Sequence, residues 1–433
     1  MTVSPARRPG SRRQTIVATT IGNALEFFDF TVYGFLAVLI GKLFFPTFSE
    51  FGQLLVAVAT FGVGFIMRPL GGIVIGAYAD RSGRKKAMTL TIFLMALGCA
   101  MIGLTPTYAQ IGVAAPIIIV LARLIQGFSA GGEVGASTTL LVEHATPANR
   151  AYMASWQFAS QGLGILMGAV LVGALTATLA PASMESWGWR LPFLLGMVIA
   201  PVGMYIRRHL EESLDEASSA PRPEKSRLAE VLSEHGGTVL AAILTISGGT
   251  VAAYVVTFYM PTYAIRELGL PPLAGLIGAV LTGLLSFVLA PFVGLMADRW
   301  GRKRLIVWSR LAMGVLIYPC FLWLNAAPSL GVLCTVVVIL TIGLVVQTVP
   351  GLTMLPEMFP KRVRASGMSL VYSVGVALFG GFSPFISTWL VNASGHKLAP
   401  AWYLLIMTLL SLVGLIWLKD HTGRDIDAVP AAA

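Results

Sequence analysis

Two carboxylates, Glu26 and Asp29, stand inside the apolar stretch GNALEFFDF (residues 22–30). Because they are three positions apart, they lie on nearly the same side of a helix. A charged side chain at the centre of a bilayer costs about 2.5–3.5 kcal/mol even on lenient insertion scales, so such groups are functional by default. Burial favours the protonated form of a carboxyl group that lacks a cationic partner. The chemistry that we expect here is reversible proton binding.

Three further charged residues, Arg68, Arg123 and Glu133, also fall inside apolar stretches. With a rise of about 1.5 Å per helical residue, all five groups lie within roughly 8 Å of the membrane midplane. Two acid–base pairs would leave one carboxylate in excess as a proton carrier. We favour Glu26 and Asp29 as the proton-linked group, which titrates as a unit, with Glu133 as the alternative. The competing interpretation is a static network that only holds three helices together.

Arg123 is the strongest candidate for contact with a substrate, because a guanidinium presents a planar fork that matches the two oxygens of a carboxylate. Arg68 is as well suited to pairing with an acid as to binding a substrate. The further candidate substrate-binding residues are Asn23, Gln126, Gln157, Gln161, Tyr254 and Tyr372. Amides that join helices are the alternative explanation for the glutamines. In the C-terminal half we expect no charge at membrane depth.

The sequence contains no recognisable catalytic set, either of metal ligands or of a nucleophile with its base. The histidines fall at the boundaries of apolar stretches or between them. Cys99, Cys320 and Cys334 fall inside apolar stretches, which predicts buried thiols rather than disulfides or metal ligands. We therefore expect no enzyme activity, no catalytic residue, no metal and no cofactor.

Composition predicts the elements that must position these groups. Of the 433 residues, 56% are hydrophobic and only 12% are charged, whereas soluble proteins have about 25% charged residues. Twelve apolar stretches reach about 20 residues or more, enough to cross about 30 Å of hydrocarbon. Only helices satisfy the backbone within such a span, so the fold class is an all-α membrane protein. The predicted spans are 15–41, 51–79, 87–105, 113–142, 151–179, 188–207, 237–263, 273–297, 304–325, 329–355, 364–391 and 399–418.

The net charge of +10 reflects membrane topology. Most of the 30 basic residues fall in the connections on one side of the predicted membrane, and Arg310 is counted with them. By the positive-inside rule, that side and both termini are cytoplasmic. We therefore expect a multi-pass protein of the inner (cytoplasmic) membrane that binds no nucleic acid.

The chain repeats itself. GAYADRSGRKK (76–86) matches GLMADRWGRKR (294–304), and EHATPANRA (143–151) matches EMFPKRVRA (357–365). A hydrophilic stretch too poor in apolar residues to form a core separates the two halves. We predict an N-terminal six-helix bundle at 1–207, a cytoplasmic linker at 208–236 and a C-terminal six-helix bundle at 237–433. Transporter sites usually lie between such repeats.

The repeated ADRxGRK loops resemble the signature loops of the major facilitator superfamily, and RLIQGFSAGGEVG (123–135) resembles its helix-4 motif. GNALEFFDF, FIMRPLGG (65–72) and ESWGWRLPF (185–193) are similar to its metabolite–proton symporter branch. Within that branch, YMPTYA (259–264) and FGGFSPFIS (379–387) are most similar to citrate and tricarballylate carriers. The resemblance implies twelve transmembrane helices in two pseudo-symmetric six-helix bundles.

By this resemblance, the signature loops form a latch that closes the cytoplasmic side in one state and releases in the other. An acid beside basic residues at a helix boundary can form a charge-assisted pair. We expect such pairs for Asp80 with Arg84 and for Asp298 with Arg302, and a tight turn or close backbone approach at Gly76. Charges that only fix topology are the alternative.

The second repeated motif adds companions to this latch. We expect Glu143 to act with Arg150, and Glu357 to act with Arg364.

These observations predict a symporter that imports a di- or tricarboxylate such as citrate together with protons by alternating access. The alternatives are proton symport of 2-oxoglutarate, an aromatic acid or a zwitterionic osmolyte, and proton-driven export of amphiphilic compounds. The expected partners are the carboxylate, protons and the lipid bilayer, and we expect a monomer.

Overall fold

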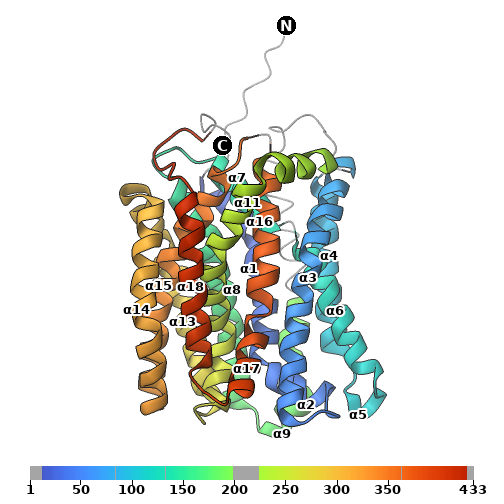
Figure 1. Cartoon of the computed structure of the whole chain (residues 1–433). Coiled ribbons are helices and arrows are strands. Elements are labelled where there is room, and N and C mark those ends of the chain that lie inside the picture. Colours follow the sequence, from blue (N-terminus) through green and yellow to red (C-terminus); the bar gives the residue numbers. More distant parts are fainter. Residues whose placement is uncertain (1–11, 83, 132, 198–223, 362, 427–433) are drawn as a thin grey trace.

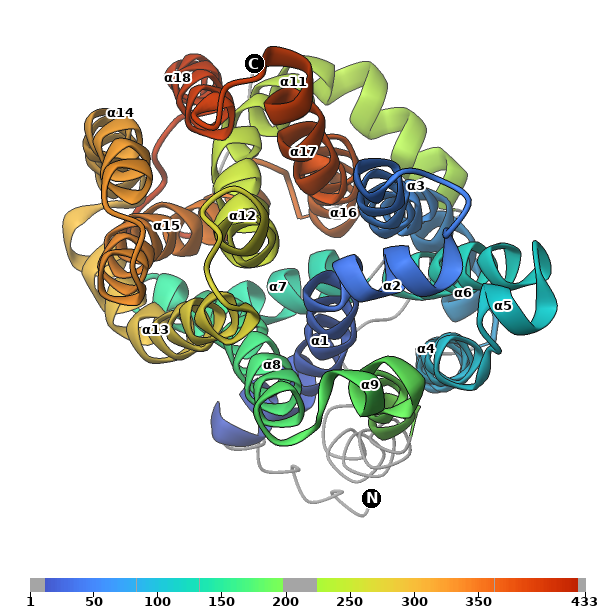
Figure 2. The same cartoon turned by 90° about the horizontal axis from the view of Figure 1, so that it is seen from below.

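The computed structural model describes residues 12–82, 84–131, 133–197, 224–361 and 363–426, which form helices and no strands. Most of the helices run roughly parallel to one long axis, and Figure 1 shows them from the side. Viewed along that axis, in Figure 2, they surround the centre of the molecule.

The N-terminal half contributes ten of the described elements. They are α1 (Arg12–Phe35), α2 (Ala37–Phe44), α3 (Glu50–Ser82), α4 (Arg84–Leu104), α5 (Tyr108–Ile111), α6 (Ala114–Ala130), α7 (Glu133–Glu143), α8 (Arg150–Thr178), α9 (Pro181–Ser183) and the π-helical turn η1 (Met184–Gly188).

The C-terminal half follows after the undescribed residues 198–223. Its elements are α11 (Glu224–Tyr254), η2 (Val255–Tyr259), α12 (Met260–Arg266), α13 (Pro272–Trp300), α14 (Arg302–Ala326), α15 (Leu330–Glu357), α16 (Arg364–Val376), η3 (Ala377–Gly381), α17 (Ser383–Ser394) and α18 (Ala399–Trp417).

Several predicted spans are bent or interrupted. Within the described residues, eight helices are long and apolar enough to cross a membrane, and α1 with α2, bent by 62°, makes a ninth. The apolar helices Thr89–Leu104 and Ala114–Ala130 are shorter, and the sixth predicted span, 188–207, is described only as far as residue 197. Part of the predicted linker belongs to α11, which kinks at His235.

Two seams join the halves, one between α8 and α13 and the other between α3 and the α16–α17 region (Figure 2). In the first seam, Gly162 of α8 faces Gly283 of α13. A Cβ added to Gly162 would lie 2.5 Å from the Phe287 backbone nitrogen, and one added to Gly283 would lie 2.5 Å from that of Leu166. Only glycine permits this backbone contact.

Candidate substrate and proton site

Two buried ion pairs occupy the interior of the N-terminal half. Arg68 Nη2 of α3 lies 2.5 Å from Glu26 Oε1 of α1, and Arg123 Nη1 of α6 lies 3.4 Å from Asp29 Oδ2 of α1. All four residues are at most 3% exposed. We call Glu26, Asp29, Arg68 and Arg123 the ion-pair cluster. Glu133 begins α7, is partly buried and interacts electrostatically with Glu26.

Aromatic rings enclose both arginines. The Arg68 guanidinium lies 4.3 Å from the centre of the Phe65 ring, and that of Arg123 lies 4.5 Å from the centre of the Tyr33 ring. Phe30 lies within 5 Å of both guanidinium groups. Cation–π contacts of this kind stabilise a desolvated guanidinium.

Gln126 and Cys99 extend the Asp29–Arg123 pair. Arg123 Nη1 donates to Gln126 Oε1 at 2.7 Å, and Cys99 Sγ donates to Asp29 Oδ1 at 3.1 Å. Gln126 Nε2 in turn donates to Cys99 Sγ at 3.6 Å. Cys99 is therefore a member of the site that sequence reasoning missed, because a cysteine in an apolar stretch resembles any small core residue.

Asn23 serves to join helices. Its Nδ2 donates to the Gln157 carbonyl oxygen at 3.0 Å and to Ser160 Oγ at 2.8 Å, which ties α1 to α8. The amide group of Gln157 has no hydrogen-bond partner although it is buried.

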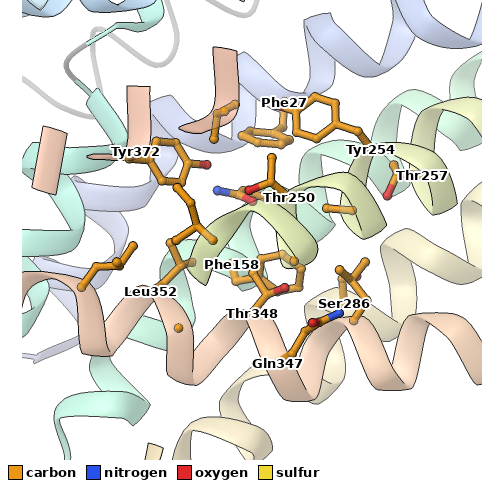
Figure 3. A pocket seen from close by; sticks show the side chains of 18 of the residues that line it. Phe27, Phe158, Thr250, Tyr254, Thr257, Ser286, Gln347, Thr348, Leu352 and Tyr372 are labelled. Carbon is orange, nitrogen blue, oxygen red and sulfur yellow. The ribbon is translucent and has the colours of Figure 1, made fainter. Parts of the chain in front are cut away.

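A cavity of about 70 Å³ lies beside the ion-pair cluster, mainly between helices of the C-terminal half. Figure 3 shows its polar and aromatic walls. Of the predicted substrate-binding residues, Gln161, Tyr254 and Tyr372 line it, whereas Asn23, Arg68, Arg123, Gln126 and Gln157 do not. Tyr254 packs with its ring 5.4 Å from that of Phe65, and the Phe65 ring in turn contacts the Arg68 guanidinium.

The expectation of no charge at membrane depth in the C-terminal half is wrong. Arg310 of α14 is 3% exposed and lines the cavity. Its Nη1 donates to the Ser411 carbonyl oxygen at 3.0 Å, its Nη2 to that of Thr245, and its Nε to Gln347 Oε1 at 3.4 Å. Arg310 follows the basic run GRKR by only six residues, which is why the sequence placed it with the loop charges.

A second charged cluster lies at one end of the seam between α8 and α13. We call Glu143, Arg150, Asp298, Arg302, Glu357 and Arg364 the gate cluster. Two of its four ion pairs join the halves and two lie within the C-terminal half. The expected pair of Asp298 with Arg302 is present, whereas Glu143 and Glu357 do not pair with the arginines of their own repeats, so that part of the expectation is wrong. The observed ion pairs are Arg150–Glu357 at 2.6 Å, Arg302–Glu357 at 3.4 Å, Arg302–Asp298 at 3.3 Å and Arg364–Glu143 at 3.1 Å. The repeat predicted which residues are charged, but Glu143 and Glu357 each take a partner from the opposite half. Arg302 of the C-terminal half binds both Asp298 and Glu357.

Asp298 also binds the start of a helix in the other half. Its Oδ1 accepts from the Ala151 backbone nitrogen and its Oδ2 from that of Tyr152, each at 2.9 Å. The first backbone N–H groups of a helix have no partner within the helix, and the helix dipole favours an anion there. Asp298 of α13 therefore caps α8 and closes the seam at this end.

The segment after α18 crosses the gate cluster. Arg150 Nη2 donates to the Arg424 carbonyl oxygen at 3.1 Å, and Arg364 Nη2 to that of Ile426 at 2.9 Å. The Ile426 side chain is buried against Val142 and Ala154 of the N-terminal half. We call residues 419–426 the tail strap.

Three predicted members of the latch fall outside this account. The surroundings of Gly76 and the side chains of Asp80 and Arg84 lie outside what the structure describes. The role of the N-terminal signature loop in the latch therefore stays a prediction.

Two helical bundles that meet along two seams beside a cavity are the arrangement of secondary transporters built from repeats. The family model described as Major Facilitator Superfamily matches residues 19–288 and 271–431. A proton:xylose symporter structure superimposes with a TM-score of 0.75 at 16% identity, covering 97% of this chain and 98% of the other.

Curated relatives agree with this assignment. The chain is 37% identical to a citrate-proton symporter of Salmonella typhi, over 97% of each chain. It is 36% identical to the citrate-proton symporter of Klebsiella pneumoniae, over 96% of this chain and 93% of the relative. It is 33% identical to a proline/betaine transporter of Salmonella typhimurium, over 98% of this chain and 87% of the relative.

The chain belongs to the major facilitator superfamily, and the resemblance inferred from its motifs is confirmed. It is a multi-pass membrane transporter with the twelve-helix fold of that superfamily, and it is not an enzyme.

Proposed function

We propose that this transporter imports a di- or tricarboxylate such as citrate together with protons across the inner membrane, with both termini in the cytoplasm. The observation that carries the proposal is the buried Glu26–Arg68 pair, 2.5 Å apart beside the cavity. The two citrate-proton symporters at 36–37% identity support the substrate class.

Coupling follows from competition for Arg68. Glu26 Oε2 is buried and has no hydrogen-bond partner, so it is the atom best placed to accept a proton. A protonated Glu26 no longer neutralises Arg68. Tyr254 of the cavity wall packs against Phe65, whose ring contacts the Arg68 guanidinium. A carboxylate of the substrate would then replace Glu26 as the partner of the guanidinium. Asp29 and Glu133 are the other candidate proton carriers.

Proton coupling also meets an energetic need. Each negative charge moved into a cell against 100 mV costs about 2.3 kcal/mol. Protons that equal or exceed the charge of the anion remove or reverse this opposition. Protonation of a buried carboxylate as the anion binds supplies that coupling.

Alternating access would let the substrate enter a cavity that is too small for it in this structure. The cavity of about 70 Å³ is well below the roughly 300–1,000 Å³ of typical ligand sites. The halves must therefore move apart before a tricarboxylate can enter. The gate cluster, which joins α8 to the C-terminal half, is the set of contacts that inward opening would break.

A zwitterionic osmolyte is the second candidate. Five aromatic rings line the cavity, from Phe27, Phe158, Tyr254, Phe258 and Tyr372, and aromatic cages bind quaternary ammonium groups. The proline/betaine transporter at 33% identity favours the same candidate.

Uptake into proteoliposomes tests the proposal. Radiolabelled citrate should accumulate only with an inward proton gradient, and excess unlabelled glycine betaine should not compete. Glu26→Gln should abolish accumulation while leaving citrate exchange intact. Glu185→Gln changes an exposed acid paired with Lys42 and should leave both activities unchanged. Accumulation of betaine but not of citrate would show that betaine, and not citrate, is the substrate. Normal citrate accumulation by the Glu26→Gln variant would show that Glu26 has only a structural role.

A further inference from the structure

We propose that Arg310 and three neighbouring side chains form a second carboxylate subsite, which lies in the C-terminal half. We call Ser286, Arg310, Gln347 and Thr348 the donor cluster. The inference deepens the proposed function and rests on it, because it requires that the transported metabolite carries a carboxylate.

The first argument is charge. The guanidinium of Arg310 donates to two carbonyl oxygens and one amide oxygen, all of them neutral. Among the described residues, no acid forms an ion pair with it, whereas Arg68 and Arg123 each have one. A buried cation without a counter-ion is costly. An anionic group entering the cavity would supply the missing charge.

The second argument is the set of unused hydrogen-bonding atoms. Ser286 Oγ, Gln347 Nε2 and Thr348 Oγ1 are buried without a partner in the structure, and all three residues line the cavity. Buried polar groups nearly always have partners, so three such atoms on one cavity wall indicate a missing ligand. Figure 3 shows Gln347 and Ser286 among the side chains that line the cavity.

The third argument is the direction of the Gln347 amide. Its Oε1 accepts from Arg310 Nε, which leaves Nε2 as a donor. Arg310 therefore fixes Gln347 with its NH₂ group available. A carboxylate accepts up to about four hydrogen bonds, and the two hydroxyls and this amide can supply three of them. Gln161 of α8 adds a further unpartnered amide nitrogen on the cavity wall.

This assignment divides the substrate between the halves. One carboxylate of a di- or tricarboxylate would bind at Arg68, and another would bind at the donor cluster. A ligand that spans both sites would hold the two bundles together, which couples binding to closure.

Two of the test variants break no hydrogen bond in the structure. Thr348→Val and Ser286→Ala remove hydroxyls that have no partner. The control, Thr282→Val, removes a buried hydroxyl of α13 that donates to the Gly278 carbonyl oxygen and does not line the cavity. Affinity for citrate, succinate and glycine betaine is measured by calorimetry on the purified full-length protein, and stability is measured by thermal unfolding.

We expect Thr348→Val and Ser286→Ala each to weaken carboxylate binding at least threefold without lowering the melting temperature. Thr282→Val should leave carboxylate binding unchanged and lower the melting temperature. Arg310→Gln should weaken binding at least tenfold, and Arg310→Lys should restore part of it.

Each contrary outcome is distinct. Unchanged affinity in Thr348→Val, Ser286→Ala and Arg310→Gln would overturn the subsite and leave the proposed function intact. Binding of betaine alone by the unmodified protein would overturn the citrate proposal, and the same variants would then test the subsite with betaine. If the unmodified protein binds none of the three ligands, the subsite is overturned together with the proposed substrate class.

Discussion

Arg150 and Glu357 belong to opposite halves of the molecule, yet their side chains meet at 2.6 Å with almost no exposure to solvent. Arg302 shares the same carboxylate at 3.4 Å, so one acid of the C-terminal half holds bases from both halves. A contact of this kind exists only while the halves are close together. It therefore reports directly on the conformational state of the transporter.

Arg150→Ala should destabilise the closed arrangement by about 3–5 kcal/mol, because it leaves Glu357 buried without its nearest counter-charge. Thermal unfolding of the purified protein measures this loss. Lys42→Ala is the control, since the Lys42–Glu185 pair is exposed and such pairs contribute about 1 kcal/mol or less. Equal losses in the two variants would contradict a special role for the buried pair.

Arg123→Ala should weaken carboxylate binding at least tenfold if Arg123 contacts the substrate. It should also lower stability, because Asp29 loses its counter-charge. The double variant Arg123→Leu with Asp29→Leu separates the two effects, since replacing a buried pair by apolar residues is often neutral or stabilising. A stable double variant with normal affinity would limit Arg123 to a structural role.

Gly283→Ala should destabilise the fold by about 1–3 kcal/mol or more, because the new methyl group would overlap the α8 backbone. Thermal unfolding is again the measurement. Gly278→Ala in the same helix is the matched control, because its Cβ would lie 3.5 Å from Val337, an ordinary contact. If Gly283→Ala is as stable as Gly278→Ala, the seam is looser than the structure shows.

Ile426→Asp should release the tail strap, because a carboxylate cannot remain buried against Val142 and Ala154. We expect a cysteine introduced by Val142→Cys to react faster with a membrane-impermeant maleimide added from the cytoplasmic side. Ile426→Leu conserves the apolar contact and should leave the labelling rate near that of the parent. Equal rates in the Asp and Leu variants would show that the strap is not part of the closed gate.

The fold could be predicted almost entirely from the sequence. Span lengths indicate twelve membrane helices, charge asymmetry indicates their topology, and the repeated motifs indicate two six-helix bundles. The acids Glu26 and Asp29 were also found in advance, because a charge in an apolar segment is conspicuous.

The partners of these charges could not be predicted with the same success. The repeat suggests that Glu143 acts with Arg150, whereas the structure pairs Glu143 with Arg364. Symmetry predicts equivalent positions in the two halves, but not which half supplies each partner. Arg310 was missed because it lies only six residues after a basic loop in the sequence and was therefore grouped with the loop charges. Its burial depends instead on the helices that pack around it.

The cavity wall was the least predictable feature. Gln161, Tyr254 and Tyr372 were expected to contact the substrate and do line the cavity. Ser286 and Thr348 were not expected there, because each is a single hydroxyl in a largely apolar segment. Isolated hydroxyls in such segments usually bond to their own backbone. Only the three-dimensional arrangement shows that these two do not.

The tail strap has a consequence for the order in which the protein is synthesised and assembled. Ile426 leaves the ribosome after every span on which it packs has been synthesised. The contacts of the tail strap with the gate cluster therefore form only after both bundles have been synthesised, and a nascent chain that contains both bundles but not Ile426 lacks them. Chains arrested before residue 419 should expose the gate cluster to added reagents, and extension through Ile426 should cover it.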